Sequence, residues 1–225
     1  MKKIIQWWNK NSTPNLLNSN ISFSYIVKYP VNHSHSERLP MLIALHGDGD
    51  TVDNFYESAL DQFKTKVRII LIKAPISHEC GDVWPFSAAQ YNKYSKAFSE
   101  LVGQLVIKYP TNSKPILLGF SGGGAMAYHQ AVTQGQSYAY IFPVSGLLLN
   151  EQLDGFLPNP GAMVFAYHGK KDEVVAFSAG QSAVKLLKSM KVKVNFTVFN
   201  SGHHGIFNDM KTEITHAIEE KLNSL

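Results

Sequence analysis

The chain alternates between two hydrophobic periods, and this alternation restricts its fold more than any other feature. Strand-like apolar runs occupy residues 21–29, 39–47, 67–75, 114–120, 138–146, 162–169 and 193–200. Between most of these runs lie segments with apolar residues at helical spacing, namely 51–63, 91–109, 122–133, 177–190 and 208–223. Strands joined through helices need crossover connections, so we expect a mostly parallel sheet with helices on both faces.

About seven strands in a chain of 225 residues fit one domain, which we place over residues 21–225. Residues 1–20 form an N-terminal lead-in, and the stretch 9–20, rich in Asn and Ser, is expected to be irregular. The span between the strands 138–146 and 162–169 is short, so we expect no large cap domain.

Charge and cysteine content exclude several classes of function. The formal net charge of +4 comes from scattered basic residues, which argues against a nucleic-acid groove. The single cysteine, Cys80, cannot form a disulfide within the chain. No apolar run is long enough for an integral membrane segment, and the apolar part of "MKKIIQWWNK" is too short for a signal peptide. We therefore expect a cytoplasmic protein.

In parallel sheets, ligands bind at the carboxyl ends of the strands, so the residues after each apolar run matter most. The segment Gly119-Phe120-Ser121-Gly122-Gly123 matches G-x-S-x-G and lies between an expected strand and an expected helix. This pattern raises a serine on a sharp turn at a helix N-terminus, where it can act as a nucleophile. The alternative is a glycine-rich turn with no chemical role.

Two further strand ends offer an acid and a base. Asp172 and Glu173 lie in a short loop, and we favour Asp172 because it comes first, although a solvated charge cluster is the alternative. His203 and His204 lie in a glycine-flanked loop before the last helix, and only one of them can face the serine. We favour His203, next to Gly202, and leave His204 open.

A fourth strand end supplies backbone donors. Acyl transfer needs N–H groups aimed at a developing oxyanion, and the glycine-rich segment after residues 39–47 suggests the N–H of Asp48 together with that of Gly122. Trp84 and Phe86 are candidate aromatic walls of a substrate pocket, with simple packing as the alternative. His78 and Cys80 form the pattern H-x-C, but without a second pair nearby we interpret it as an ordinary loop and expect no metal site.

The order Ser121, Asp172, His203 is that of α/β hydrolases. The segments "LHGDGDTVDNF", "GFSGGGAMAYHQA", "HGKKDEVV" and "GHHGI" together resemble the carboxylesterase/phospholipase family of α/β hydrolases, which includes acyl-protein thioesterase-like enzymes. The resemblance implies an α/β-hydrolase fold with Ser121 as nucleophile, Asp172 as acid and His203 as base. The chain departs from the family at Asp48, where an apolar residue is common.

The function implied is that of a serine hydrolase that cleaves small-molecule carboxylic esters, including lysophospholipid-like ones, through an acyl-enzyme. Such a reaction needs no metal or organic cofactor. A thioesterase or a serine peptidase on the same three residues is the alternative among enzymes. A non-catalytic relative that binds a lipid or a protein is the alternative outside enzymes. The oligomeric state is not readable from the sequence.

Overall fold

The computed structural model describes the backbone of residues 8–15 and, in full, residues 21–30, 33 and 36–225. In this part of the chain the main sheet has eight strands in the order β1-β2-β4-β3-β7-β8-β9-β10. The strands are β1 (Trp8–Asn15), β2 (Phe23–Pro30), β3 (Met41–Leu45), β4 (Arg68–Ile72), β7 (Ile116–Phe120), β8 (Tyr140–Val144), β9 (Met163–Gly169) and β10 (Val194–Phe199). Two short strands, β5 (Ile76–His78) and β6 (Gly81–Val83), form a separate hairpin.

The sheet is parallel from β4 across to β10, and only β2 runs in the opposite direction, so its pairings with β4 and with the edge strand β1 are antiparallel. This arrangement confirms the mostly parallel sheet expected from the alternation of strand and helix patterns. The parallel strands share one carboxyl edge, so the loops that follow β3, β7, β9 and β10 gather at that edge.

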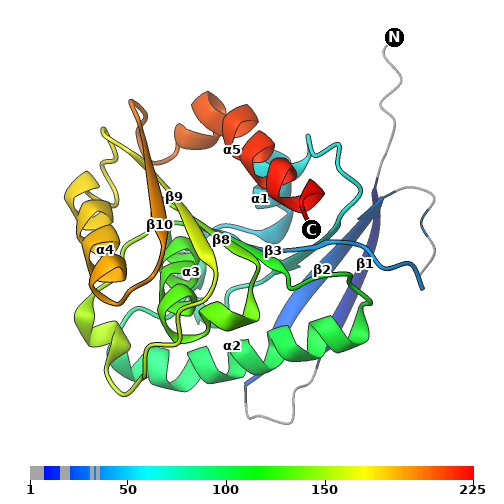
Figure 1. The fold of residues 1–225 in the computed structure, drawn as a ribbon, viewed down its shortest axis with the longest axis horizontal. Coiled ribbons are helices and arrows are strands. Elements are labelled where there is room, and N and C mark those ends of the chain that lie inside the picture. The colour runs from blue at the N-terminus through cyan, green and yellow to red at the C-terminus, as the bar shows by residue number, and fades with distance from the viewer. Residues whose placement is uncertain (1–7, 16–20, 31–32, 34–35) are drawn as a thin grey trace.

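Helices cover both faces of the sheet (Figure 1). They are α1 (Val52–Phe55), which continues into a π-helical turn η1 (Tyr56–Leu60), α2 (Ala88–Lys108), α3 (Gly122–Thr133), α4 (Phe177–Ser189) and α5 (Ile206–Asn223). Alternate residues of β3 feed two separate cores: Ile43 packs with residues of α2, α3 and α4, whereas Ala44 packs with residues of α1, η1 and α5. The period of two along the strand therefore separates the two layers.

The stretch 9–20 was expected to be irregular, and this is wrong for residues 9–15, which lie in β1. This strand pairs antiparallel with β2, from Trp8 opposite Pro30 to Asn15 opposite Phe23. An edge strand is held by backbone hydrogen bonds on one side, so it does not need an apolar alternation, and it tolerates a proline such as Pro14. Residues 16–20 lie outside the described residues, and the division into a lead-in and one domain stays a prediction.

The connection from β8 to β9 spans residues 145–162 and contains only a short 3-10 turn, η3 (Asn150–Leu153). It is too short to form a cap domain over the carboxyl edge of the sheet. In the described part of the chain, no helix combines the length and the apolar character needed to cross a membrane.

Candidate active site

Ser121 occupies a strained turn between β7 and α3. Its backbone has φ 53° and ψ −118°, a region that residues with a side chain rarely adopt. The N–H of Ser121 donates to the carbonyl of Val144 on the neighbouring strand at 2.9 Å, which anchors the turn to the sheet. The turn therefore places the hydroxyl group at the carboxyl edge of the sheet, where His203 in the loop after β10 reaches it.

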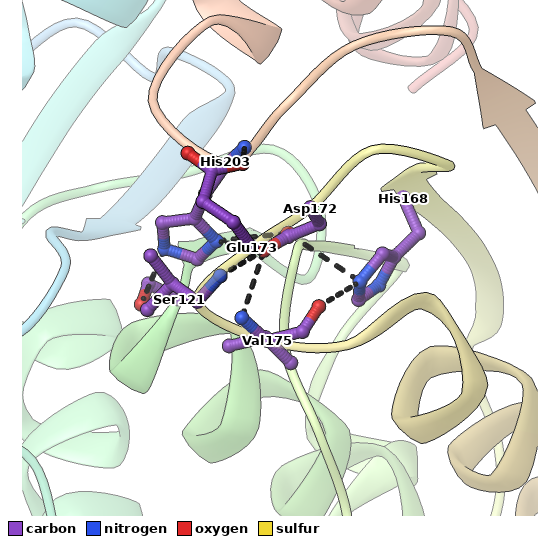
Figure 2. Close-up of polar contacts among 7 residues, drawn as sticks. Ser121, His168, Asp172, Glu173, Val175 and His203 are labelled. Atoms are coloured by element: carbon purple, nitrogen blue, oxygen red, sulfur yellow. Dashed lines mark hydrogen bonds and ion pairs between the residues drawn. The ribbon is translucent and has the colours of Figure 1, made fainter.

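His203 joins Ser121 to Asp172 (Figure 2). Its Nε2 lies 3.0 Å from Oγ of Ser121, and its Nδ1 lies 2.8 Å from Oδ2 and 2.9 Å from Oδ1 of Asp172. A carboxylate only accepts, so Nδ1 carries the hydrogen and Nε2 is free to accept the serine proton. The buried imidazole also packs on the ring of Phe120, with 4.9 Å between the ring centroids. Its orientation is therefore fixed on several sides.

The carboxylate of Asp172 is buried and accepts several hydrogen bonds. Besides His203, its Oδ1 accepts the backbone N–H of Val174 at 3.1 Å and that of Val175 at 2.8 Å. These bonds fix the orientation of the carboxylate toward His203. Glu173, the neighbouring candidate acid, is exposed, and among the described residues its carboxylate accepts a hydrogen bond only from the backbone N–H of His203, at 3.3 Å.

The neighbouring histidine, His204, is exposed and lies edge-on to His203, with 5.1 Å between the ring centroids. The structure therefore brings Ser121, His203 and Asp172 into one chain of hydrogen bonds. It places Glu173 and His204 beside that chain.

The loop after β3, residues 46–50, is fixed by a buried histidine. Nε2 of His46 accepts the N–H of Ala74 at 2.9 Å, and Nδ1 donates to the carbonyl of Gly47 at 2.7 Å. Burial lowers the pKa of His46, against the opposing effect of the bond to Gly47. A neutral imidazole with one donor and one acceptor thus ties the loop to the end of β4.

Asp48 anchors the same loop from the other side. Its Oδ1 accepts the backbone N–H of Trp84 at 2.7 Å, and the N–H of Gly49 donates to the carbonyl of Asp82 at 2.9 Å. The hairpin of β5 and β6 therefore supports the loop. Loss of solvent around the carboxylate raises the pKa of Asp48, and the bond from Trp84 opposes this effect.

Gly122 lies directly beside the Asp48 carboxylate. A Cβ atom built on Gly122 would lie 2.3 Å from Oδ2 of Asp48, so only glycine fits there without a shift. Among the hydrogen bonds of the described residues, none is donated by the backbone N–H of Asp48 or of Gly122. Two backbone donors without a partner in the described part of the chain therefore belong to residues that line the same pocket as Ser121.

A pocket of about 620 Å³ opens in front of the serine. Its lining includes Asp48, Phe86, Ser121, Leu147, Val174 and His204. The volume is in the range of sites for small organic molecules. The pocket combines apolar walls with two of the three hydrogen-bonded side chains, Ser121 and His203.

Of the two aromatic residues expected to line the pocket, Phe86 does so and is 63% exposed. The expectation for Trp84 is wrong: it is only 2% exposed and packs in the core, edge-on to Phe98. Its indole N–H donates to the carbonyl of His46 at 2.8 Å. The large apolar ring gains more from burial than from lining an open pocket, and the carbonyl satisfies its one polar atom.

The sequence pattern of the Phospholipase/Carboxylesterase family matches residues 83–222, which is more than half of the chain. The chain belongs to the phospholipase/carboxylesterase family. Acyl-protein thioesterase 1 of Neurospora crassa is 26% identical to this family member over 201 residues, covering 75% of the chain and 82% of the relative. Acyl-protein thioesterase 1 of Aspergillus fumigatus is 29% identical over 113 residues, so the match spans only 47% of the chain and 47% of that relative.

Solved structures agree on the fold of this phospholipase/carboxylesterase family member. Esterase PE8 superposes with a TM-score of 0.70 at 19% identity, covering 83% of this chain and 94% of that one. SOBER1 of Arabidopsis thaliana gives 0.69 at 22% identity, covering 81% and 99%. The carboxylesterase of Bacillus cereus gives 0.68 at 13% identity, covering 92% and 95%. The chain has the α/β-hydrolase fold and, by its family, is a hydrolase of the carboxylesterase/phospholipase type.

Proposed function

We propose that the protein hydrolyses small-molecule carboxylic esters, with Ser121 as nucleophile, His203 as general base and Asp172 as the acid that orients His203. The observation that carries this proposal is the continuous chain of hydrogen bonds from Asp172 through His203 to the hydroxyl of Ser121. A strained serine at a helix N-terminus is well placed to attack a carbonyl carbon.

In the proposed reaction, Nε2 of His203 takes the proton of Ser121 as Oγ forms a bond to the acyl carbon. The carbonyl oxygen becomes an oxyanion and accepts the N–H groups of Asp48 and Gly122. The intermediate then expels the alcohol, which receives its proton from His203. Water repeats the sequence on the acyl-enzyme and releases the acid, so no other reactant is needed.

The open pocket supports a preference for short or medium acyl groups. It has a volume of about 620 Å³ and no cap domain above it in the described part of the chain. Exposed Phe86 and Val174 at its lining offer apolar surface to an acyl chain. Lysophospholipid-like esters with longer chains would extend beyond these walls into solvent.

Replacing the nucleophile tests the proposal. Ser121→Ala should abolish labelling by a fluorophosphonate probe and reduce turnover of p-nitrophenyl butyrate by at least about 10⁴-fold. Ser145→Ala is a matched control. Ser145 also comes directly after a strand and has a positive φ, 47°, but its buried hydroxyl has no hydrogen-bond partner in the described part of the chain. Turnover by Ser121→Ala close to that of the control would overturn the proposal.

Hydrolysis of thioesters is a second candidate, since both curated relatives are named acyl-protein thioesterase 1. The same three side chains would form the same acyl-enzyme from a thioester. An oxygen ester and a thioester with one acyl group separate the two candidates. A kcat/KM for the thioester more than about tenfold higher would favour thioesterase activity, and the reverse would favour esterase activity.

We also propose that the enzyme acts in the cytoplasm. Its single cysteine, Cys80, is exposed and free, as expected in a reducing compartment. Fractionation of cells that produce the tagged protein tests this, and recovery outside the cytoplasm would contradict it.

A further inference from the structure

His168 is a buried histidine that the proposed reaction does not use. It lies near the end of β9, four residues before Asp172, and its side chain is completely excluded from solvent. Buried imidazoles are uncommon unless their nitrogen atoms serve a purpose. The contacts of this ring therefore need an explanation.

One nitrogen of His168 reaches the loop that holds Asp172 (Figure 2). Nε2 lies 2.8 Å from the carbonyl oxygen of Val175 and 3.4 Å from Oδ2 of Asp172. A carbonyl oxygen only accepts, so Nε2 carries the hydrogen and donates it to Val175. The same nitrogen also faces Oδ2 of the Asp172 carboxylate.

Val175 is thereby held on both sides. Its carbonyl accepts from His168, and its own N–H donates to Oδ1 of Asp172 at 2.8 Å. These two hydrogen bonds connect His168, Val175 and the Asp172 carboxylate within one short loop. If the carboxylate turns away from His203, its hydrogen bond from the N–H of Val175 must break.

Helix α4 fixes the imidazole from behind. A Cβ atom on Gly180 would lie 2.3 Å from Nδ1 of His168, so the ring rests against the bare backbone of the helix. Nδ1 itself is buried and has no hydrogen-bond partner among the described residues. The ring therefore acts through Nε2 alone, and its place is set by the absence of a side chain at position 180.

We propose that His168 is a positioning residue that keeps the carboxylate of Asp172 aligned with Nδ1 of His203. It does so through Val175, without touching the substrate or the reacting atoms. This inference rests on the proposed function. It predicts that loss of the Nε2 donor lowers the rate of the chemical step more than it weakens substrate binding.

Two substitutions separate positioning from simple packing. His168→Leu keeps the bulk of the ring and removes the donor, so kcat for p-nitrophenyl butyrate should fall about 10- to 100-fold with KM within about threefold. His168→Gln offers an amide N–H at a similar reach and should recover most of the lost kcat. His129→Leu removes another fully buried imidazole, on α3, and should leave kcat within about threefold of the wild type at temperatures where each variant is folded. Equal kcat values for the Leu and Gln variants at position 168 would overturn the inference.

A second readout needs no turnover. The proton between Nδ1 of His203 and Asp172 should give a low-field resonance in the proton NMR spectrum, which His203→Gln would assign by removing it. In His168→Leu this resonance should shift or broaden, and in His168→Gln it should persist. An unchanged resonance in His168→Leu would refute the positioning role. If instead the wild type hydrolyses no ester, the proposed function fails, and the resonance still decides the role of His168.

Gly180 provides an independent approach to the same imidazole. Gly180→Ala should displace the ring of His168 and reduce kcat by a factor similar to that of His168→Leu. In a His168→Ala background the added methyl group has free space, so the same change should reduce kcat much less. An equal loss in both backgrounds would show that Gly180 acts without His168 and would count against the inference.

Discussion

At the scale of single residues, the side chains that fit at positions 48 and 122 depend on each other. The carboxylate of Asp48 fills the space that a side chain at position 122 would need. The same carboxylate holds the backbone of Trp84, and the backbone N–H of Asp48 is one of the two proposed oxyanion donors. A change at either position should therefore alter the geometry of the proposed oxyanion site.

Adding one methyl group tests this pairing. Gly122→Ala should lower kcat/KM for p-nitrophenyl butyrate by about 10- to 100-fold, because the methyl group displaces the Asp48 loop from the serine. Asp48→Ala alone should lower it less, since alanine keeps the backbone N–H. The measurement is a double-mutant cycle on kcat/KM.

In that cycle the double variant Asp48→Ala, Gly122→Ala should be more active than Gly122→Ala alone, because the smaller side chain leaves room for the methyl group. Strictly additive losses would mean that the two positions act independently. They would contradict the steric account.

Most of the candidate site could be predicted at this scale from the order of Ser121, Asp172 and His203 along the chain, and the structure brings these three side chains together. The burial of the Trp84 side chain in the core could not be predicted from the sequence. Aromatic residues close together in a loop follow no regular spacing that would distinguish a core residue from a pocket wall. The contact of His168 with Val175 could not be predicted either, since it depends on how the loop folds back on the strand.

At the scale of elements, β1 closes the far edge of the sheet from the candidate site. It pairs with β2, whereas the site is built on the loops after β3, β7, β9 and β10. A strand with an unpaired edge can pair with another chain and start aggregation, and β1 prevents this by pairing with the edge of β2.

Deleting residues 1–15 should separate stability from catalysis. The truncated protein should unfold at a lower temperature and scatter more light on warming, because β2 becomes an exposed edge. Its kcat/KM below the unfolding temperature should stay within about threefold of that of the full chain, since β1 pairs with β2 at the edge of the sheet and the site is built on the loops after β3, β7, β9 and β10. Thermal unfolding, light scattering and ester hydrolysis measured on both proteins provide the check. A large loss of kcat/KM in the folded truncated protein would contradict this separation.

The major elements were predictable because apolar alternation, continuous apolar runs and helical spacing of apolar residues report burial, and α2 to α5 and the strands β2 to β10 of the main sheet each follow one of these patterns. Three parts of the structure were not predictable in this way. β1 has no apolar alternation, the strands of the β5–β6 hairpin contain three residues each, and the segment 51–63 forms a single α-helical turn that widens into a π-helix. In each case tertiary contacts rather than local pattern determine the structure.

At the scale of the whole molecule, a buried histidine makes stability depend on pH. His129 on α3 is completely buried, and burial lowers its pKa to about 4. In the unfolded chain the same imidazole returns to an ordinary pKa of about 6.5. Between these two values the unfolded state binds the extra proton, so the free energy of unfolding falls as the pH falls from about 6.5 to about 4.

A difference of this size corresponds to about 3 kcal/mol of stability lost across that pH range. His129→Phe should remove this part of the pH dependence, because phenylalanine keeps the stacking on Tyr91 without a titrating nitrogen. Urea unfolding between pH 4 and pH 7 measures the slope. His216→Gln, at an exposed position on α5, should leave the slope unchanged. If His129→Phe keeps the wild-type slope, the loss of stability at low pH comes from other groups.

The short connection between β8 and β9 has a consequence for the timing of catalysis. Where an enzyme closes a domain over its substrate, the opening of that domain often limits turnover. Here nothing in the described part of the chain has to move aside before a product leaves the pocket. The turnover rate should therefore be set by breaking and re-forming the acyl bond, and a more viscous solvent should leave kcat almost unchanged.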